Sequence, residues 1–161
     1  MPDPARPDDT ATRDDGVLSA PLVIEYPFKR TVGPVQSAFL TGLREQVVVG
    51  VRRSTGGVLF PPVEYDPDTA EELTELVELA STGIVTSWAW ISEPRPYQPL
   101  DHPFAWALVR LDGTDSLILH AVDAGDEAAM STGMRVRIRW SDERRGHITD
   151  IACFEPEGAG A

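Results

Sequence analysis

Three arginines at alternating positions, Arg135, Arg137 and Arg139, are the most concentrated candidates for chemistry in the chain. In a β-strand they would share one face, because successive side chains of a strand point in opposite directions. Arg144 and Arg145 follow closely. Guanidinium groups bind phosphates and carboxylates, so the pattern predicts an anion site, for example for a nucleotide-like cofactor, or a face for an acidic partner. The alternative is a solvated face that pairs with the chain's own carboxylates.

The other reactive side chains are isolated in the sequence. His102, His120 and His147 show no spacing typical of a metal site, and His102 is expected in a turn and His120 in a strand. If the chain were an enzyme by itself, one of these two would be the best available acid or base. Cys153 lies in the apolar context "IACFEP", which predicts a buried, inert thiol. Without a glycine-rich phosphate loop or a nucleophile elbow, the sequence nominates no catalytic centre.

The formal net charge of −12 restricts the partners that the chain can bind. A strongly acidic protein is a poor match for nucleic acids and anionic membranes. No apolar run approaches the roughly 20 residues of a membrane helix, so we expect a soluble, cytoplasmic protein. Tryptophans on the expected strands could stack single-stranded bases, but the charge favours packing in the core or at a partner interface. These tryptophans are Trp88, Trp90, Trp106 and Trp140.

Acidic residues are concentrated in "VEYDPDTAEELTELVE", which contains no basic residue. Such a run is typical of a solvated face, because its residues lack an apolar pocket that could raise a pKa. The end of the run, in "AEELTELVELAS", fits either a helix or a strand. Upstream, the apolar stripe of Val35, Phe39, Leu40 and Leu43 predicts a short amphipathic helix from Pro34 to about Arg44.

Beyond Gly83 the chain consists of five short runs rich in branched and aromatic residues: "GIVTSWAWI", "PFAWALVRL", "SLILHAV", "MRVRIRW" and "HITDIACF". The segment "DAGDEAAMSTG", which separates the third and fourth runs, predicts one or two helical turns. Three strands, a short helix and two strands is the element order of the five-stranded Greek-key barrel called the OB-fold. A generic antiparallel sandwich would also accommodate this pattern. The predicted fold class is therefore mainly β.

The ordered series of motifs resembles a family of acyl-CoA-associated proteins that combine a rubredoxin-like zinc ribbon with an OB-fold. The resemblance rests on "VVVGVRRSTGGVLFPPVEYDPDT", "STGIVTSW" and "GMRVRIRW", and it covers the chain from about residue 21 to 156. Six residues match the non-cysteine framework of the ribbon: Gly50, Arg52, Gly57, Pro61, Pro62 and Pro67.

The same resemblance places the four zinc cysteines of the family at Arg53, Gly56, Asp66 and Thr69. None of these residues supplies a thiolate, so the ribbon is expected to be degenerate and to bind no zinc. The expected organisation is a disordered tail (1–20), an extended segment and helix (21–46), the degenerate ribbon (47–80), the OB-fold barrel (81–156) and a second disordered tail (157–161).

The resemblance implies a non-catalytic accessory subunit in a hetero-oligomer. Its partner would be a thiolase-like enzyme, of the lipid-transfer thiolase or aldolase type, that acts on acyl-CoA thioesters in steroid or lipid side-chain degradation. The partner would carry the catalytic residues and share the acyl-CoA, and no cofactor would be tightly bound. The alternatives are a small stand-alone CoA-ester hydratase or thioesterase, and a single-stranded nucleic-acid-binding OB protein.

Two groups of residues follow from the subunit hypothesis. We expect the helix and the ribbon to dock on the partner through Phe39, Leu40, Leu43, Phe60, Pro61 and Pro62. We expect the CoA phosphates or the carboxylates of the partner to contact Arg52, Arg53, Arg135, Arg137 and Arg139.

Overall fold

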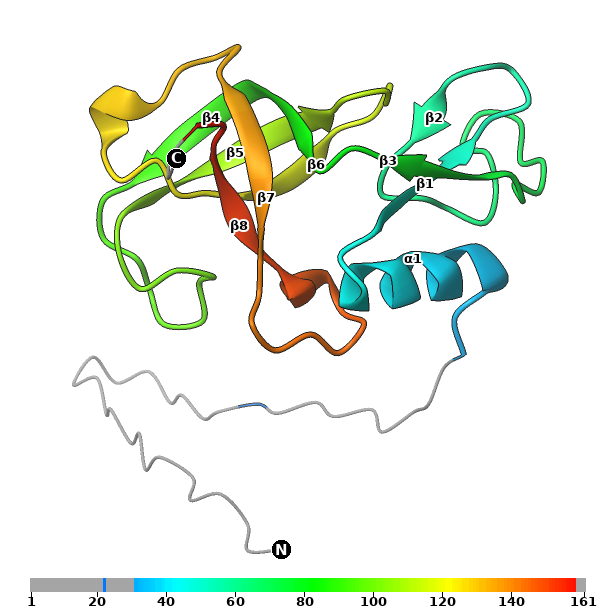
Figure 1. Ribbon diagram of the computed structural model, residues 1–161, viewed down its shortest axis with the longest axis horizontal. Helices are drawn as coiled ribbons and strands as arrows, with labels where there is room; N and C mark the ends of the chain where they lie inside the picture. The colour runs from blue at the N-terminus through cyan, green and yellow to red at the C-terminus, as the bar shows by residue number, and fades with distance from the viewer. Residues whose placement is uncertain (1–21, 23–30, 159–161) are drawn as a thin grey trace, which may run out of the picture. The chain divides into compact units, whose positions relative to one another are not determined.

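The computed structural model describes Leu22 and residues 31–158. The predicted tail 1–20, most of the extended segment before the helix and the last three residues of the predicted C-terminal tail lie outside the described residues. Within the described part, no helix is long and apolar enough to cross a membrane. The elements in chain order (Figure 1) are α1 (Pro34–Arg44), β1 (Val48–Arg52), β2 (Val58–Leu59), β3 (Leu76–Leu79), β4 (Thr82–Ile91), β5 (Phe104–Leu111), β6 (Ile118–Val122), η1 (Glu127–Ala129), β7 (Arg135–Trp140), η2 (Ile148–Asp150) and β8 (Ile151–Pro156).

The predicted helix is confirmed as α1, with a proline in its first turn. Its N-cap, Gly33, offers no side chain, and the cap is supplied instead by a distant residue of the acidic run. The carboxylate of Glu64 accepts hydrogen bonds from the backbone N–H groups of Val35 (3.3 Å) and Gln36 (2.9 Å). A negative charge is favourable at this end of a helix. Gly33 leaves room for this carboxylate, because a Cβ there would collide with it.

The segment expected to be a ribbon contains a three-stranded antiparallel sheet in the order β2-β1-β3. The ambiguous end of the acidic run is a strand, because β3 pairs along β1 from Val48–Leu79 to Val51–Leu76. Strand pairing here overrides the helix-like spacing of the leucines. No residue of β3 is fully buried, and β3 forms an outer edge of the sheet.

The five C-terminal strands form a closed barrel in the order β4-β5-β6-β8-β7. All pairs are antiparallel except β6 with β8, which are parallel. Closure into one barrel excludes the sandwich alternative and confirms the predicted OB-fold. In Figure 1 the strands β7 and β8 run side by side across the front of the barrel.

Two local predictions needed correction or refinement. The expected helix between the third and fourth barrel strands is only a three-residue 3-10 helix, η1, and Met130, which follows it, is buried in the barrel core. The last strand does not start at His147 as predicted, because residues 147–150 form the cap and body of η2. His147 accepts a hydrogen bond from the Thr149 N–H (3.3 Å), and Asp150 accepts one from the His147 N–H (3.2 Å).

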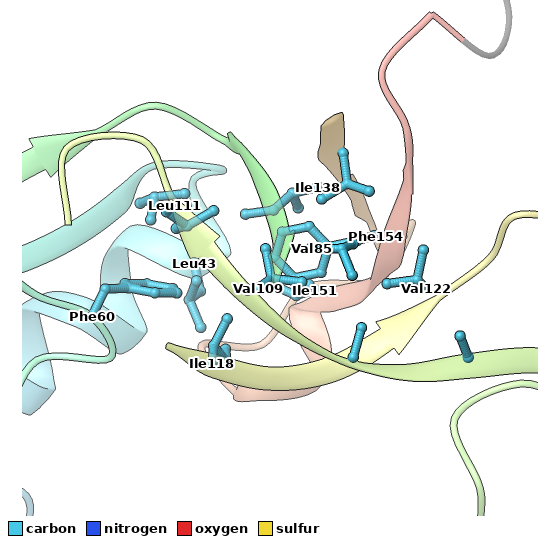
Figure 2. Packing of buried hydrophobic residues seen from close by; sticks show 14 of the residues in the cluster. Leu43, Phe60, Val85, Val109, Leu111, Ile118, Val122, Ile138, Ile151 and Phe154 are labelled. Atoms are coloured by element: carbon cyan, nitrogen blue, oxygen red, sulfur yellow. The ribbon is translucent and has the colours of Figure 1, made fainter. Parts of the chain in front are cut away.

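A single hydrophobic core joins the barrel to α1 and to the sheet that precedes it. Figure 2 shows Leu43 of α1 and Phe60, which follows β2, facing the barrel residues Val109 and Leu111. The rings of Phe39 and Phe60 pack edge to face at a centroid distance of 5.7 Å. All of these side chains are buried.

This packing corrects most of the predicted docking surface. Phe39, Leu43 and Phe60 are 0–3% exposed, and Pro62 is also buried, so their side chains contact the chain itself rather than a partner. Leu40 is half-buried, and only Pro61 is exposed. The apolar stripe was predicted correctly as one face of an amphipathic helix, but the surface that covers it is the protein's own barrel.

Replacing Leu43 by alanine should therefore destabilise the isolated chain. We expect the free energy of unfolding to fall by about 2–5 kcal/mol, the usual cost of a buried leucine, measured by urea denaturation. Leu40→Ala on the same helix is the matched control and should cost clearly less, because Leu40 is only half-buried. Equal losses for the two variants would show that α1 is not docked as described.

Candidate functional site

The arginines of β7 point away from the barrel core and are all ion-paired. Val136 and Ile138, at the intervening positions, are buried in the core. Arg135 donates to both carboxylate oxygens of Asp112 (2.7 Å each) and to Glu157 (2.7 Å). These hydrogen bonds from Arg135, and one from the Thr82 hydroxyl, lower the pKa of Asp112 to about 2. Glu157 was predicted to lie in a disordered tail, and this contact places it in the ordered domain.

The remaining two arginines of the stripe are engaged in the same way. Arg137 pairs with Glu155 (2.8 Å), and Arg139 pairs with Asp123 (2.8 Å) and more distantly with Glu155 (3.7 Å). The three side chains are 39–43% exposed. The face is thus a solvated, internally paired strand face, the second of the two alternatives. A phosphate would have to compete with a carboxylate of this chain at each position.

The other two arginines of the predicted anion site are also paired. Arg52 contacts Glu75 at the surface (2.7 Å). Arg53 donates from Nε and Nη2 to the two oxygens of Asp66 (2.7 and 3.0 Å) and also contacts Asp68. Asp66 is 2% exposed, which corrects the prediction that the acidic run is solvated throughout.

The Arg53–Asp66 pair connects the two turns that hold the four predicted zinc positions. In the first turn the Gly56 N–H donates to the Arg53 carbonyl (3.1 Å). In the second, the Asp66 carboxylate accepts from the N–H groups of Asp68 (2.9 Å) and Thr69 (3.2 Å). Hydrogen bonds from Arg53 and then from the backbone lower the pKa of Asp66 to about 2. A guanidinium–carboxylate bridge therefore lies where the resemblance implies a metal.

His102 is bound at both ring nitrogens. Its Nδ1 lies 3.1 Å from an oxygen of Asp101, and its Nε2 lies 3.2 Å from an oxygen of Asp123. The hydrogen bond with Asp101 is the main cause of a raised pKa, which favours the imidazolium form. His102 therefore links the β4–β5 loop to the end of β6, and it has no free nitrogen to act as a base.

His120 lies in a different environment, on the wall of a pocket of about 420 Å³. Burial lowers the pKa of His120, and its ring packs edge to face on Phe154 at 5.7 Å. Trp106 of β5, Leu119 of β6 and Ile148 of η2 are further parts of this wall. The pocket lies over the second and third barrel strands, between the loops that precede β5 and β8, where OB-folds commonly bind ligands.

Residues 76–141, which run from β3 through β7 to Ser141, match the sequence model of the family described as "ChsH2, C-terminal OB-fold domain". This part of the chain, which includes four of the five barrel strands, is therefore similar in sequence to the ChsH2-type OB-fold domain. No curated protein matches the chain in sequence.

Two solved structures are similar to this chain in fold. One is a DUF35-family protein of unknown function from Sulfolobus solfataricus (TM-score 0.58, 18% identity), which covers 78% of this chain and 87% of its own. The other is described as the Ltp2-ChsH2(DUF35) aldolase (TM-score 0.58, 18% identity), with coverage of 80% and 98%. At this identity the likeness establishes the fold.

Sequence reasoning missed several residues that organise this domain. Glu64, Asp66 and Asp123 were indistinguishable from surface acids, yet they cap a helix, bridge two turns and hold both Arg139 and His102. Leu119 and Ile148 of the pocket also gave no signal, because their neighbours in space come from other strands and loops.

Two further observations concern reactive groups in the described part of the chain. No group of three or more His, Cys, Asp or Glu residues could hold a metal within it. Cys153 is buried, and burial raises the pKa of its thiol to about 11. That value keeps the thiol protonated and non-nucleophilic at neutral pH.

The Arg53–Asp66 bridge predicts a specific pH dependence. Because folding depresses the pKa of Asp66 from 3.8 to about 2, its contribution to stability is present above pH 3.8 and lost as the pH falls towards 2. Asp66→Asn should lower the urea midpoint at neutral pH, and the difference from wild type should shrink across this acidic window. Asp68→Asn is the control and should lower the urea midpoint less, because Asp68 is 72% exposed.

A chelator should leave the urea midpoint of the wild-type protein unchanged. A lower midpoint in the presence of the chelator would reveal a structural metal.

Cys153 should resist alkylation while the protein is folded. Iodoacetamide at neutral pH is expected to modify it only after denaturation, because both burial and the raised pKa suppress the thiolate. Mass spectrometry of native and denatured samples measures this directly. Rapid native labelling would mean that the thiol is accessible and more acidic than the structure indicates.

Proposed function

We propose that this chain is a non-catalytic OB-fold subunit of a cytoplasmic hetero-oligomer whose partner is a thiolase-like enzyme of the lipid-transfer thiolase or aldolase type. The partner acts on acyl-CoA thioesters in steroid or lipid side-chain degradation. The observation that carries the proposal is the match of the barrel to the ChsH2 C-terminal OB-fold domain. The likeness in fold to a structure described as an Ltp2-ChsH2 aldolase supports it.

The state of the reactive side chains supports a subunit without chemistry of its own. A stand-alone hydratase or thioesterase needs a free acid or base beside its substrate. His102 is held by two carboxylates, and Cys153 is buried with a raised pKa. His120, the other candidate base, lines a pocket that contains no second acid or base. The alternative of a nucleic-acid-binding OB protein finds no support in the described β7 face, because every arginine of the β7 stripe is paired with a carboxylate.

The internal ion pairs refine the proposed role in acyl-CoA binding. The five arginines first considered for the CoA phosphates each contact a carboxylate of this chain. We infer that the partner supplies most of the positive charge for the phosphates. The subunit then helps to hold the acyl-CoA by shaping and stabilising the assembled enzyme.

Exposed apolar side chains in residues 63–76 are the surface that we propose for docking on the thiolase-like partner. Val63 and Tyr65 lie in the segment between β2 and β3 and are 36% and 60% exposed. Leu76, on the open edge strand β3, is 44% exposed. They replace Phe39, Leu43 and Phe60, which the core buries. An exposed edge strand with apolar side chains is a common site of protein association.

Co-expression with a thiolase-like protein of the lipid-transfer type tests the proposal. We expect the two proteins to elute together in size-exclusion chromatography and the partner to lose activity or yield when expressed alone. Separate elution, with independent turnover of acyl-CoA by each protein, would overturn the subunit assignment.

The docking surface is tested separately by Leu76→Asp. A carboxylate at an apolar interface should weaken co-elution by about tenfold or more. Leu117→Asp is a closely matched control, because Leu117 is 43% exposed and lies outside the proposed surface. If the complex forms but both variants bind the partner like wild type, docking involves another face.

A further inference from the structure

The pocket beside His120 has a structural origin in the incomplete pairing of two barrel strands. The described pairing of β6 with β8 is confined to Val122 and Phe154. Earlier along both strands the sheet is open, and Leu119 of β6 and Ile151 of β8 become walls of the pocket. Its volume of about 420 Å³ lies in the range of small-molecule sites, roughly 300–1,000 Å³.

The lining of this pocket differs in charge from its surroundings. No Asp, Glu, Lys or Arg residue lines it, although the chain carries a net charge of −12. By contrast, Glu93 and Arg95 line the cavity at the end of β4, and Glu143 and Arg145 line the one in the β7–β8 loop. A pocket without charged walls disfavours phosphates and carboxylates, because their charge would be desolvated without a partner.

The lining also contains three residues that can form hydrogen bonds, His120, Ser141 and Thr149. The Nδ1 atom of His120 is buried and has no hydrogen-bond partner among the described residues. Native proteins satisfy nearly all buried polar atoms, and an exception often marks the place of a water molecule or a ligand. Burial also keeps the imidazole neutral, so the ring offers one donor and one acceptor. Trp106, on the neighbouring strand β5, adds a large aromatic surface to the lining.

We propose that this pocket binds an uncharged, largely apolar small molecule that carries a single oxygen able to hydrogen-bond with His120. Trp106, Leu119 and Ile148 would enclose its apolar body. The proposal concerns the isolated chain and does not depend on the partner enzyme, so the two can fail independently.

A titration of the ¹⁵N-labelled full chain, followed by NMR at neutral pH, tests the proposal with three related probes. 2-Naphthol is neutral and carries one hydroxyl group, naphthalene lacks the hydroxyl, and 2-naphthalenesulfonate is an anion. We expect saturable binding of 2-naphthol, weaker binding of naphthalene and the weakest binding of the sulfonate. Absence of saturable binding by 2-naphthol, or equal or tighter binding of the sulfonate, would overturn the proposal.

Two leucines of the same segment locate the site. Leu119→Asp should weaken 2-naphthol binding by about tenfold or more, because the carboxylate would be desolvated against an apolar ligand. Leu117→Asp should bind like wild type, since Leu117 is exposed but does not line the pocket. Leu119 is 61% exposed, so the fold should tolerate the substitution. Equal affinity of the two variants contradicts the assignment.

His120→Phe tests the polar part of the proposal. The variant keeps the aromatic contact with Phe154 and should still bind naphthalene, but it should lose the preference for 2-naphthol. A preserved preference for 2-naphthol would show that His120 does not recognise the oxygen.

Leu119→Asp also distinguishes a small-molecule pocket from a partner contact. If this variant still binds 2-naphthol but no longer co-elutes with the thiolase-like protein, the pocket holds a side chain of the partner, and the small-molecule proposal is wrong.

Discussion

The rest of the structure depends on the packing of α1 and Phe60 against the barrel. The side chains of Phe39, Leu43 and Phe60 share one core with Val85 and Val109. Burying apolar surface in this way is the main favourable term of folding, and a short helix or a three-stranded sheet with few buried residues would be marginal alone. The helix and sheet are thus held by the barrel, and they extend it into one compact unit.

Charge has a structural role in this acidic protein. Carboxylates cap α1, bridge the two turns between β1 and β3, and neutralise the arginines of β7. The Arg53–Asp66 bridge deserves comparison with a metal site, because it also joins two turns through directional contacts to one centre. It differs in strength and in chemistry, since protons rather than chelators should weaken it. Because Arg53 and the β7 arginines already form ion pairs with carboxylates of the same chain, they are poorly suited to bind phosphates by themselves.

The proposed function uses the same features. His102 is held by two carboxylates and Cys153 is buried, while the edge strand β3 of the small sheet exposes apolar Leu76. This combination suits association with an enzyme. The uncharged pocket beside His120 stands apart from both the ion-paired face and the edge strand. It exists because β6 and β8 of the barrel pair at only one end, which opens the wall between Leu119 and Ile151.

The sequence by itself determined the elements whose signals are local. Alternating apolar residues predicted the strands of the barrel, the apolar stripe and Pro34 predicted α1, and the order of these elements predicted the OB-fold. The context of Cys153 predicted its burial. These features depend on periodicity and on neighbouring residues, which a linear sequence contains in full.

Only the tertiary structure decided which surfaces meet. It showed that the apolar stripe of α1 is covered by the chain's own barrel, that Asp66 is buried against Arg53, and that the β7 arginines are already paired. It also brought Trp106, His120 and Ile148 together from separate elements. The physical reason is that burial and pairing depend on contacts between residues far apart in the sequence, and an exposed and a buried carboxylate look alike until their partners are in place.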